Sequence, residues 1–567
     1  MDLVSIQFDI GKEIPLTEGG EGIIYEYKEK IIKVYKPGID KDKKQRKIQL
    51  LMKKALPKEV VCPLELVVDK KGEFIGYSMD KVEGEEIRKL ANKKFTTINN
   101  ITTKDIIQIL VKVQKTLEQL HKDQIYIGDL NDRNILFDKD NNIYWIDCDS
   151  WSIETENCQM AMVLFCDPKL QANNFNQETD IYAFYILAWK LLTRIHPFGG
   201  TMVPDINIVE RMKKGISVIG HTGIIIPKVV KSWKIFSPNY VERSKRTFEL
   251  GERKFGRELE EMAENLKYCK KDKEYYYGNY TSCPLCNQYA QIQKKPIIKE
   301  ESNGLYCMPL FQKESIKVMV NEFSYLDKEG YIIDIRNKKK VKYQYGIKYY
   351  FTEKGYQIEE RKGNIIIYSN QIYQLEKKYR SDIIVEENHI YYISRQHTFM
   401  DITVLESGNS IKPVCKCSNQ AYFKVENGQY CIVNICHGRL VFHRNGRNTE
   451  LEYQDKIQNC GIHYDNLTKK WLIILENERG SFLTCILGEN GIEYQDNQIS
   501  YSCNLEHICI SASILYIPLE GKIRGYSYQK STYKDFICEI IVESSKLIKK
   551  KNKFLVINEE NVYQVGK

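Results

Sequence analysis

The sequence predicts a multidomain chain with an α+β domain over residues 1–265, a small cysteine-rich connector over 266–310 and an all-β domain over 311–567. Three observations favour this division. The chain has 567 residues, and a single hydrophobic core rarely grows beyond about 250–300 residues. Helical and strand patterns alternate in the first part, whereas short alternating strands dominate the last part. A polar segment rich in Lys, Tyr and Cys lies between them.

The composition is that of a globular protein. With 43% hydrophobic and 28% charged residues, it excludes wholesale disorder, collagen and coiled coil. Lys and Arg number 84 against 75 Asp and Glu, a surplus too dilute to indicate a nucleic-acid partner. No apolar run approaches the roughly 18 residues of a membrane span, and MDLVSIQFDI is acidic where a signal peptide would be basic. We therefore expect a cytoplasmic protein without a membrane partner, whose seventeen cysteines are mostly free thiols.

A glycine-rich turn near the N-terminus is a candidate phosphate-binding element. The segment LTEGGEGIIYEYKEKIIKVYK predicts a strand, a turn containing Gly19, Gly20 and Gly22, and two further strands, the last of which carries Lys33. Glycines let backbone amides approach phosphates, and a lysine on a neighbouring strand can neutralise them. A plain hairpin turn without a ligand is the alternative.

The segment from Thr103 to His121 has the period of an amphipathic helix. The apolar residues on its expected buried face are Ile106, Leu110, Val113, Leu117 and Leu120.

The strongest chemical signal follows this helix, in IYIGDLNDRNILFDKDNNIYWIDCDSW. Asp129 and Asn134 lie on one loop, and Asp147 follows across a predicted apolar hairpin. Because a hairpin brings its two ends together, we expect these three oxygen-bearing side chains to converge on one point. Such a set suits Mg²⁺ and the phosphates that it bridges.

GDLNDRNIL followed by IDCDSW resembles the catalytic and metal-binding loops of the protein-kinase fold. TDIYAFYILAWKLLTRIHPFGG resembles the helix of that fold that opens with a buried aspartate, here Asp180. More narrowly, the EGGEG turn, the D-x-D-S-W ending, ERMKKGIS, FELGER and the trailing CPLC resemble a bacterial kinase-like family of stress-response and tellurite-resistance-type operons. Some of its members occur beside a phosphatase and a von Willebrand-type protein. The resemblance covers about residues 10–290 and does not reach the β-rich half.

The resemblance implies a bilobal protein-kinase-like domain that uses ATP and Mg²⁺. It gives Asp129 the role of the base that orients the acceptor hydroxyl, and Asp180 that of a brace for the catalytic-loop backbone. It also implies a cofactor site whose residues are Gly19, Gly20 and Gly22 in the phosphate loop, Lys33 on the phosphates, Met79 and Lys81 in the adenine hinge, and Asn134 and Asp147 as magnesium ligands.

Several departures from this pattern matter. The helix KDKKQRKIQLLMKKAL lacks the glutamate that should pair with Lys33, which leaves Gln45 or Gln49 as weaker partners. Gly128 stands before Asp129 in place of the arginine that often receives a phosphorylated loop, so we expect activity without phosphorylation within 150–166. Asp149 stands where a glycine is usual, and we expect it to cap a turn or, alternatively, to touch a second ion.

The connector contains a candidate zinc site. Cys283 and Cys286 have the two-residue spacing that lets both thiolates reach one tetrahedral ion. Cys269 is a credible third ligand and Cys307 the candidate fourth, with Glu274 behind it. Reduced thiols without a metal are the alternative.

The β-rich part contains strand-turn-strand units that recur about every 40–50 residues, which favours a β-propeller of about five or six blades over a pair of β-sandwiches. The whole chain is then interpreted as a Ser/Thr protein kinase whose propeller recruits a protein partner or substrate, with a cognate phosphatase as a possible partner. A nucleotide-binding pseudokinase scaffold and a small-molecule phosphotransferase are the alternatives.

Overall fold

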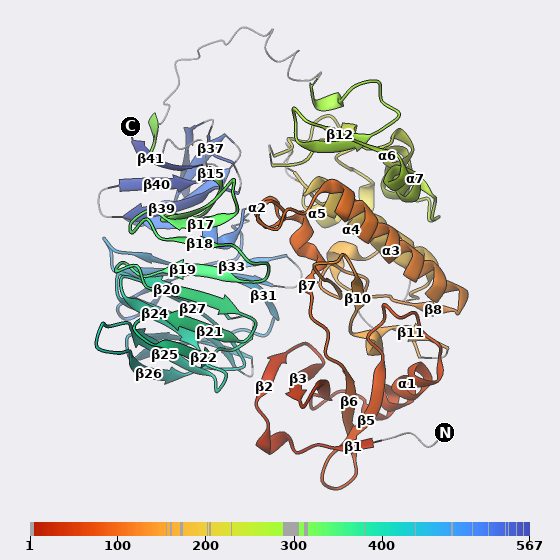
Figure 1. The fold of residues 1–567 in the computed structure, drawn as a ribbon, viewed down its shortest axis with the longest axis horizontal. Helices are drawn as coiled ribbons and strands as arrows, with labels where there is room; N and C mark the ends of the chain where they lie inside the picture. Colours follow the sequence, from red (N-terminus) through yellow and green to blue (C-terminus); the bar gives the residue numbers. More distant parts are fainter. Residues whose placement is uncertain are drawn as a thin grey trace. The chain divides into compact units, whose positions relative to one another are not determined.

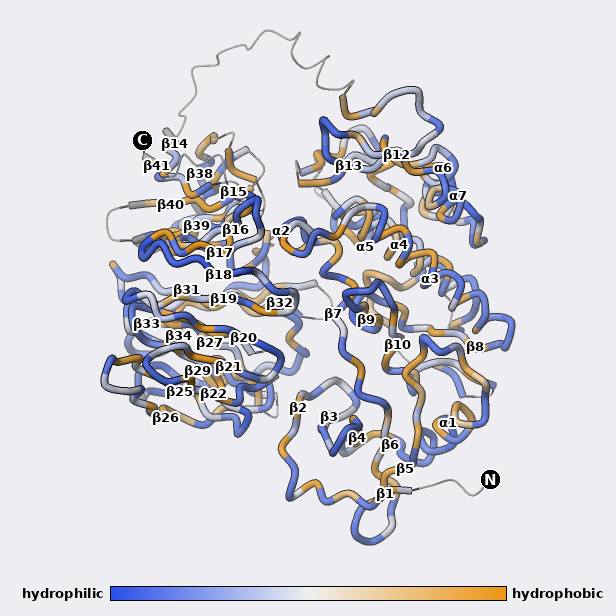
Figure 2. Tube along the Cα trace, in the orientation of Figure 1, coloured by the Kyte–Doolittle hydropathy of each residue, from blue (hydrophilic) through white to orange (hydrophobic). Residues whose placement is uncertain are grey.

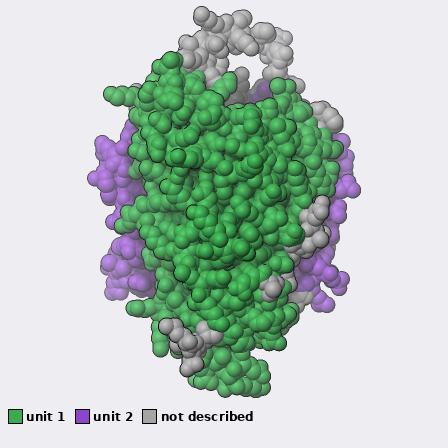
Figure 3. All heavy atoms as spheres, turned by 90° about the vertical axis from the view of Figure 1, so that its right-hand side faces the viewer, with its two compact units in different colours: residues 1–13, 24–299 green, residues 14–23, 300–567 purple. Residues whose placement is uncertain are grey.

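The structure is a computed structural model. It describes residues 5–566 apart from gaps at 155, 159–160, 171–173, 201, 203–205, 228, 287–305, 311–315, 380, 437, 478–479, 500, 502, 520, 539, 543, 551–552 and 559–560. The chain forms two compact units, residues 1–13 with 24–299 and residues 14–23 with 300–567 (Figure 3). We describe each unit by itself.

A six-stranded sheet begins the chain, in the order β1-β5-β6-β4-β3-β2 (Figure 1). Its strands are β1 (Ser5–Gln7), β2 (Pro15–Glu18), β3 (Gly22–Tyr27), β4 (Lys30–Tyr35), β5 (Pro63–Val68) and β6 (Phe74–Asp80), of which β2 belongs to residues 14–23 of the second unit. Helix α1 (Lys41–Lys53) packs on β5 and β6 through the buried Ile48 and Leu51. Lys33 lies directly opposite Tyr77 in the antiparallel register of β4 and β6, so the two side chains are neighbours on one face of the sheet.

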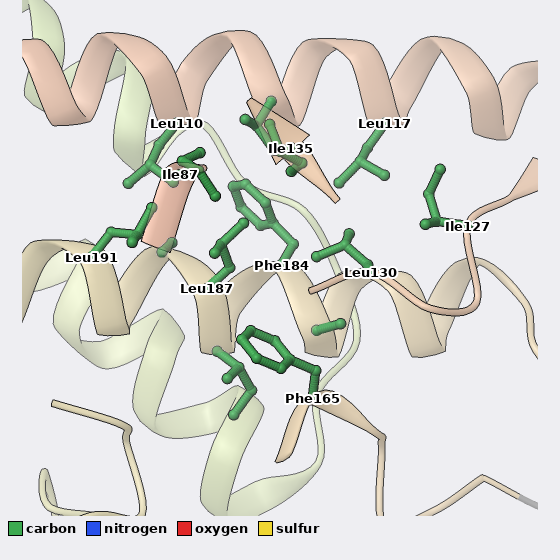
Figure 4. Packing of buried hydrophobic residues seen from close by; sticks show 14 of the residues in the cluster. Ile87, Leu110, Leu117, Ile127, Leu130, Ile135, Phe165, Phe184, Leu187 and Leu191 are labelled. Atoms are coloured by element: carbon green, nitrogen blue, oxygen red, sulfur yellow. The ribbon is translucent and has the colours of Figure 1, made fainter. Parts of the chain in front are cut away.

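Helices α3 and α4 form the centre of the helical part that follows. α3 begins with a capping box of Thr102 and Asp105, and every residue of its predicted apolar face is buried, which confirms that prediction. In Figure 4, Leu110 and Leu117 of α3 point toward Phe184 and Leu187 of α4. The helices of this part are α2 (Lys93–Ile98), α3 (Thr103–Lys122), α4 (Gln177–Thr193), α5 (Ile208–Lys214), α6 (Pro238–Lys245), a π-helix (Arg246–Leu250) and α7 (Glu258–Glu264).

Short strands carry the loops between these helices. The predicted hairpin is present as β9 (Ile135–Phe137) and β10 (Ile143–Trp145), which pair antiparallel. β7 (Glu85–Glu86) pairs with β9, and β8 (Ile125–Tyr126) pairs with β11 (Ser152–Ile153).

The connector contains more regular structure than its sequence indicates. β12 (Leu266–Cys269) and β13 (Glu274–Tyr277) form an antiparallel hairpin within the segment that the sequence marks only as polar and rich in Lys, Tyr and Cys. Neither strand alternates apolar and polar residues: Lys267 and Tyr268 of β12 are exposed, and every residue of β13 is half-buried.

The second unit contains, among the described residues, seven four-stranded sheets. Six follow one another along the chain, and the seventh joins the first strand of this region, β14, to the last three. The first three sheets are β15–β18 (Ile316–Asn321, Ser324–Asp327, Tyr331–Asp334, Lys340–Lys342), β19–β22 (Lys348–Phe351, Gln357–Arg361, Asn364–Tyr368, Ile372–Glu376) and β23–β26 (Ile383–Glu386, His389–Ile393, Thr398–Thr403, Ser410–Lys416). The next three are β27–β30 (Gln420–Glu426, Gln429–Cys436, Arg439–Arg444, Arg447–Glu452), β31–β34 (Ile457–Asp465, Lys470–Asn477, Phe482–Gly488, Gly491–Asp496) and β35–β38 (Cys509–Ser511, Ile514–Leu519, Lys522–Ser527, Thr532–Ile537). The seventh joins β14 (Tyr306–Pro309) to β39–β41 (Lys546–Lys550, Lys553–Ile557, Val562–Gly566). The expected number of repeats, five or six, is therefore wrong, because most sheets recur at a shorter interval than we assumed.

Both faces of a sheet in this unit can be buried against its neighbours. In β32, Ile473 and Leu475 pack in a cluster with Val433 and Phe442 of the preceding sheet. Leu472 and Ile474, which point the other way, pack in a cluster with Ile510 and Leu515 of the following sheet. Successive residues of a strand face opposite sides, so this strand is apolar on both. Figure 2 shows the resulting hydrophobic segments along the strands of this unit.

The cysteines whose side chains the structure describes are all free thiols, as expected. Among the described residues, no helix combines the length and the apolar character that crossing a membrane requires.

Candidate active site

The β9–β10 hairpin brings the three predicted oxygen ligands together. Asn134 directly precedes β9 and Asp147 follows β10, and the Ile146 N–H donates to the Asn134 carbonyl at 3.0 Å. The Asn134 side-chain amide donates to the Asp129 carbonyl at 3.1 Å and approaches its carboxylate at 3.5 Å. Asp129, Asn134 and Asp147 thus lie on two adjoining loops.

Lys33 reaches this group from the sheet. Its ammonium contacts the carboxylates of both Asp147 and Asp149, and its distance to the Asp149 Oδ1 is 2.7 Å. Lys33 is only 5% exposed, and burial alone would lower the pKa of its ammonium. The two carboxylates outweigh burial and raise that pKa well above its ordinary value. Lys33 is therefore a fixed cation.

Asp149 has a role that the sequence pattern did not predict. Its side chain is fully buried and takes hydrogen bonds from the Tyr35 and Tyr77 hydroxyls, both at 2.8 Å. Burial raises the pKa of this carboxyl, but Lys33 and Lys44 outweigh it and hold the pKa well below its usual range. Asp149 is not a turn cap in this structure: in the short 3-10 helix that contains it, the N-cap is Asp147, with φ of 66°.

The partner of Lys33 therefore differs from the one expected. We expected Gln45 or Gln49 of helix α1, whereas the carboxylates that Lys33 contacts come from the loop after β10. The physical reason is charge. A carboxylate two residues from Asp147 can satisfy a buried ammonium, which a neutral amide does less well.

Asp180 braces the loop that carries Asp129, as the resemblance implied. Its fully buried carboxylate accepts the N–H groups of Ile127 and Gly128 at 2.8 and 2.9 Å, and lies 3.0 Å from the His121 Nε2. These contacts fix the backbone just before Asp129.

Two further contacts hold the segment that follows Asp149. The Met162 N–H donates to the Asp129 Oδ1 at 2.8 Å, which orients that carboxylate. At the end of the segment, the Arg253 guanidinium binds the Asp167 carboxylate through two nitrogens at 2.6 and 2.8 Å, and both side chains are buried.

The structure also places the remaining predicted residues. Gly19 and Gly20 lie in the turn between β2 and β3, and Gly22 is the first residue of β3; the Gly19 N–H closes the turn by donating to the Gly22 carbonyl at 2.8 Å. Met79 is 9% exposed near the end of β6. Lys81 follows this strand, and its ammonium pairs with Glu26 of β3 at 2.6 Å.

Cys269, Cys283 and Cys286 lie together at the end of the β12–β13 hairpin, with Asp272 as the fourth member of the group. Their ligand atoms all lie within 4.8 Å of one another. The Asp272 Oδ2 is 3.2, 3.1 and 2.8 Å from the sulfurs of Cys269, Cys283 and Cys286, and the Cys269 and Cys286 sulfurs are 3.7 Å apart. This Cys/Asp cluster is a possible metal-binding site.

Of the other two candidate ligands, Cys307 belongs to the second unit and Glu274 has other partners. The backbone of Cys307 is in β14, paired with β41 of the second unit, and its side chain lies outside the described residues. Glu274 binds Lys231 at 2.7 Å and accepts the Thr103 hydroxyl at 2.5 Å. Asp272 takes the place expected for Cys307, because the turn between β12 and β13 carries it to the three cysteines.

Comparisons with known proteins agree with this geometry. Residues 21–250 match the family model of the protein kinase domain. Two curated proteins, the mitogen-activated protein kinase kinase kinases dlk-1 of Caenorhabditis elegans and of Caenorhabditis briggsae, are each 21% identical to this chain, over 178 and 170 residues. The matches cover 27% and 25% of this chain, which spans about a fifth of the length of these relatives, 19% and 20%. The N-terminal part of this chain therefore contains a protein kinase domain.

Proposed function

We propose that this chain is a Ser/Thr protein kinase that uses ATP and Mg²⁺. The proposal rests on how four side chains are brought together. Lys33 of β4 contacts Asp147, and the loop that carries Asp147 adjoins the loop that carries Asp129 and Asn134. Asn134 and Asp147 are the residues that would hold Mg²⁺, which would neutralise charge on the transferred phosphoryl group. Lys33 would bind the phosphates, and Asp129 would orient the acceptor hydroxyl and accept its proton.

The test is phosphoryl transfer from radiolabelled ATP with Mg²⁺, using the full chain beside Asp129→Asn and Asp147→Asn. We expect label on protein, lowered by about 10²–10⁴-fold when Asp129 is replaced. Asp140→Asn, an exposed aspartate of the same hairpin, is the matched control and should keep the activity. Nucleotide binding without transfer would favour the pseudokinase scaffold, and label only on small acceptors would favour a small-molecule phosphotransferase.

We also propose zinc as the occupant of the Cys/Asp cluster. Three thiolates and one carboxylate are ligands that Zn²⁺ accepts, and a tetrahedral site with Zn–S bonds of about 2.3 Å separates sulfurs by roughly 3.8 Å. The 3.7 Å between the Cys269 and Cys286 sulfurs fits this geometry. Metal analysis of the purified chain should give one zinc per chain, lost in Cys283→Ser and weakened in Asp272→Ala. Cys307→Ser is the control: loss of zinc in that variant would favour the ligand expected from the sequence.

For the second unit we propose a seven-bladed β-propeller that recruits a protein partner or substrate. Seven four-stranded sheets, burial on both faces of β32, and the joining of β14 to β41 in one sheet support this proposal. Crosslinking of the full chain to a protein that it phosphorylates, followed by mass spectrometry, tests the recruiting role. We expect crosslinks to residues 306–566, and crosslinks confined to residues 21–250 would contradict it.

A further inference from the structure

Helix α1 lies beside the candidate active site but offers Lys33 no acid. Its sequence, KDKKQRKIQLLMK, contains one acidic residue, Asp42, whose side chain is exposed. The carboxylates that Lys33 contacts, Asp147 and Asp149, both come from the loop after β10.

These two carboxylates differ in their surroundings. The Asp147 side chain is 38% exposed, whereas that of Asp149 is completely buried. The partly exposed Asp147 carboxylate can take a metal ion on its open side, whereas the buried Asp149 carboxylate, surrounded by donors, cannot. Asp149 can therefore hold Lys33 while Asp147 binds a cation.

Four side chains, from β4, β6 and helix α1, hold the Asp149 carboxylate. Its Oδ1 accepts from Lys33 at 2.7 Å and from Tyr77 at 2.8 Å, and its Oδ2 accepts from Tyr35 at 2.8 Å and lies 3.4 Å from the Lys44 ammonium. Lys44 also donates to the Asp149 carbonyl at 3.2 Å. A carboxylate with this many donors has one stable orientation.

Basic side chains of helix α1 contact the segment that begins at Asp149. Lys44 binds Asp149, and the Arg46 Nε lies 3.1 Å from the Glu156 Oε1. The buried Lys47 donates to the Asn157 carbonyl at 3.3 Å. Three cations on one helix contact one segment, so the helix and the loop are positioned together.

We propose that Asp149 is the residue that positions Lys33 for the nucleotide phosphates, and that Lys44 of helix α1 fixes Asp149 in turn. In the expected arrangement, helix α1 would supply the acid that pairs with Lys33. In this chain the loop after β10 supplies that acid, Asp149, and helix α1 supplies a second cation, Lys44. This inference rests on the proposed nucleotide-dependent function. Asp149 and Lys44 are positioning residues.

The experiment measures Mg-ATP affinity, KM for ATP and kcat of the full chain in Asp149→Asn and Lys44→Gln. We expect weaker affinity, a higher KM and a loss of up to about 10²-fold in kcat/KM for Asp149→Asn, with a smaller loss for Lys44→Gln that Lys44→Arg restores. Asp42→Asn, an exposed residue of the same helix, is the control and should change little.

A second readout separates positioning from a purely structural role. Modification of Lys33 by an amine-reactive reagent at one fixed pH, with and without Mg-ATP and followed by mass spectrometry, reports whether bound nucleotide covers that ammonium. We expect Mg-ATP to protect Lys33 in the wild type and to protect it less in Asp149→Asn at the same nucleotide concentration. If Asp149→Asn does not fold, the paired hydroxyl variants Tyr35→Phe and Tyr77→Phe should together raise KM for ATP.

The outcomes distinguish the two proposals. Wild-type protein that neither binds nor uses ATP would overturn the proposed function and with it the premise of this inference. Wild-type protein that binds ATP without transfer would overturn the kinase activity alone, and the affinity of Asp149→Asn would still decide the positioning role. Folded Asp149→Asn with wild-type affinity, KM and nucleotide protection of Lys33 would overturn the inference while leaving the kinase proposal standing.

Discussion

The Lys231 ammonium and the Glu274 carboxylate form an ion pair of 2.7 Å between the helical part and the hairpin that carries the cysteines. Their side chains are 10% and 20% exposed, and the hydroxyl of Thr103, the first residue of α3, also donates to Glu274. The pair therefore anchors the β12–β13 hairpin to the kinase domain.

We expect Glu274→Gln to lower the free energy of unfolding by about 2–4 kcal/mol, because it leaves the Lys231 charge largely buried without a partner. Burial raises the pKa of Glu274, but Lys231 and Thr103 outweigh it and lower that pKa. The stabilisation is thus present above the unfolded-state pKa of about 4.3 and is lost as pH falls through the folded-state value. Denaturant unfolding at several pH values measures this, with the exposed Glu264→Gln as the control. Equal losses in both variants would contradict it.

Removing the brace at Asp180 should affect both stability and turnover. Asp180→Ala leaves two buried N–H groups, of Ile127 and Gly128, without their acceptor, at about 1–3 kcal/mol each. The loop that carries Asp129 then loses its fixed conformation, so kcat should fall more than KM for ATP rises. Thermal unfolding and steady-state kinetics test this beside Glu178→Gln, an exposed residue of the same helix. Unchanged kcat in a destabilised Asp180→Ala would show that the brace is structural only.

Lys47 should make stability depend on pH in the alkaline range. Burial and the neighbouring Lys44 lower the pKa of Lys47 to about 8, against the favourable effect of Asp149. Between pH 8 and about 10.4 the unfolded state keeps a proton that the folded state has released, so stability contributed by this site rises with pH. Lys47→Met should stabilise the protein at pH 7 by about 1–3 kcal/mol, an advantage that fades above about pH 10. Lys43→Met is the control, and an advantage that persists at pH 11 would contradict the assignment.

The segment after the metal loop should not need phosphorylation. Gly128 offers no charge to a phosphate, and Arg46 already binds Glu156 of this segment. The Ser150 hydroxyl donates to the Asp147 carbonyl at 2.9 Å, so Ser150→Ala should lose one hydrogen bond, about 0.5–1.5 kcal/mol, and keep most of the turnover. Thr155, which lies outside the described residues, should tolerate Ala as well. Phosphatase-treated wild type is the reference, and loss of turnover with intact ATP binding in either variant would prove the expectation wrong.

The parts of the site that the sequence predicted are those set by local patterns. Asn134 and Asp147 flank two short apolar strands, and antiparallel pairing of these strands fixes their proximity. Helix α3 carries an apolar residue every three or four positions, so its buried face follows from the spacing of these residues alone.

The partner of Lys33 could not be predicted in this way. Asp149 contacts Tyr35 and Tyr77 of the sheet, and the backbone two residues before it, at Asp147, adopts φ of 66°, a conformation that the apolar pattern of the hairpin does not predict. One signal was present in the sequence: helix α1 carries Lys44 and Lys47 where an acid was expected, and buried cations require an anion nearby. Asp272 was missed for a related reason, because an aspartate in a lysine-rich turn resembles an ordinary turn residue.

The pairing of β14 with β41 has a consequence for how the chain matures. β14 (Tyr306–Pro309) is the edge strand that pairs with β41 (Val562–Gly566). The first and last strands of this region must therefore pair before their sheet has all four strands. Such contacts between residues far apart along the chain form slowly, because the intervening loop must first close. During synthesis on the ribosome, β14 is made long before β41, because all the residues between Pro309 and Val562 are added in the interval. A nonsense codon ahead of β39 would leave that edge open to pairing with another molecule, so truncated products should aggregate.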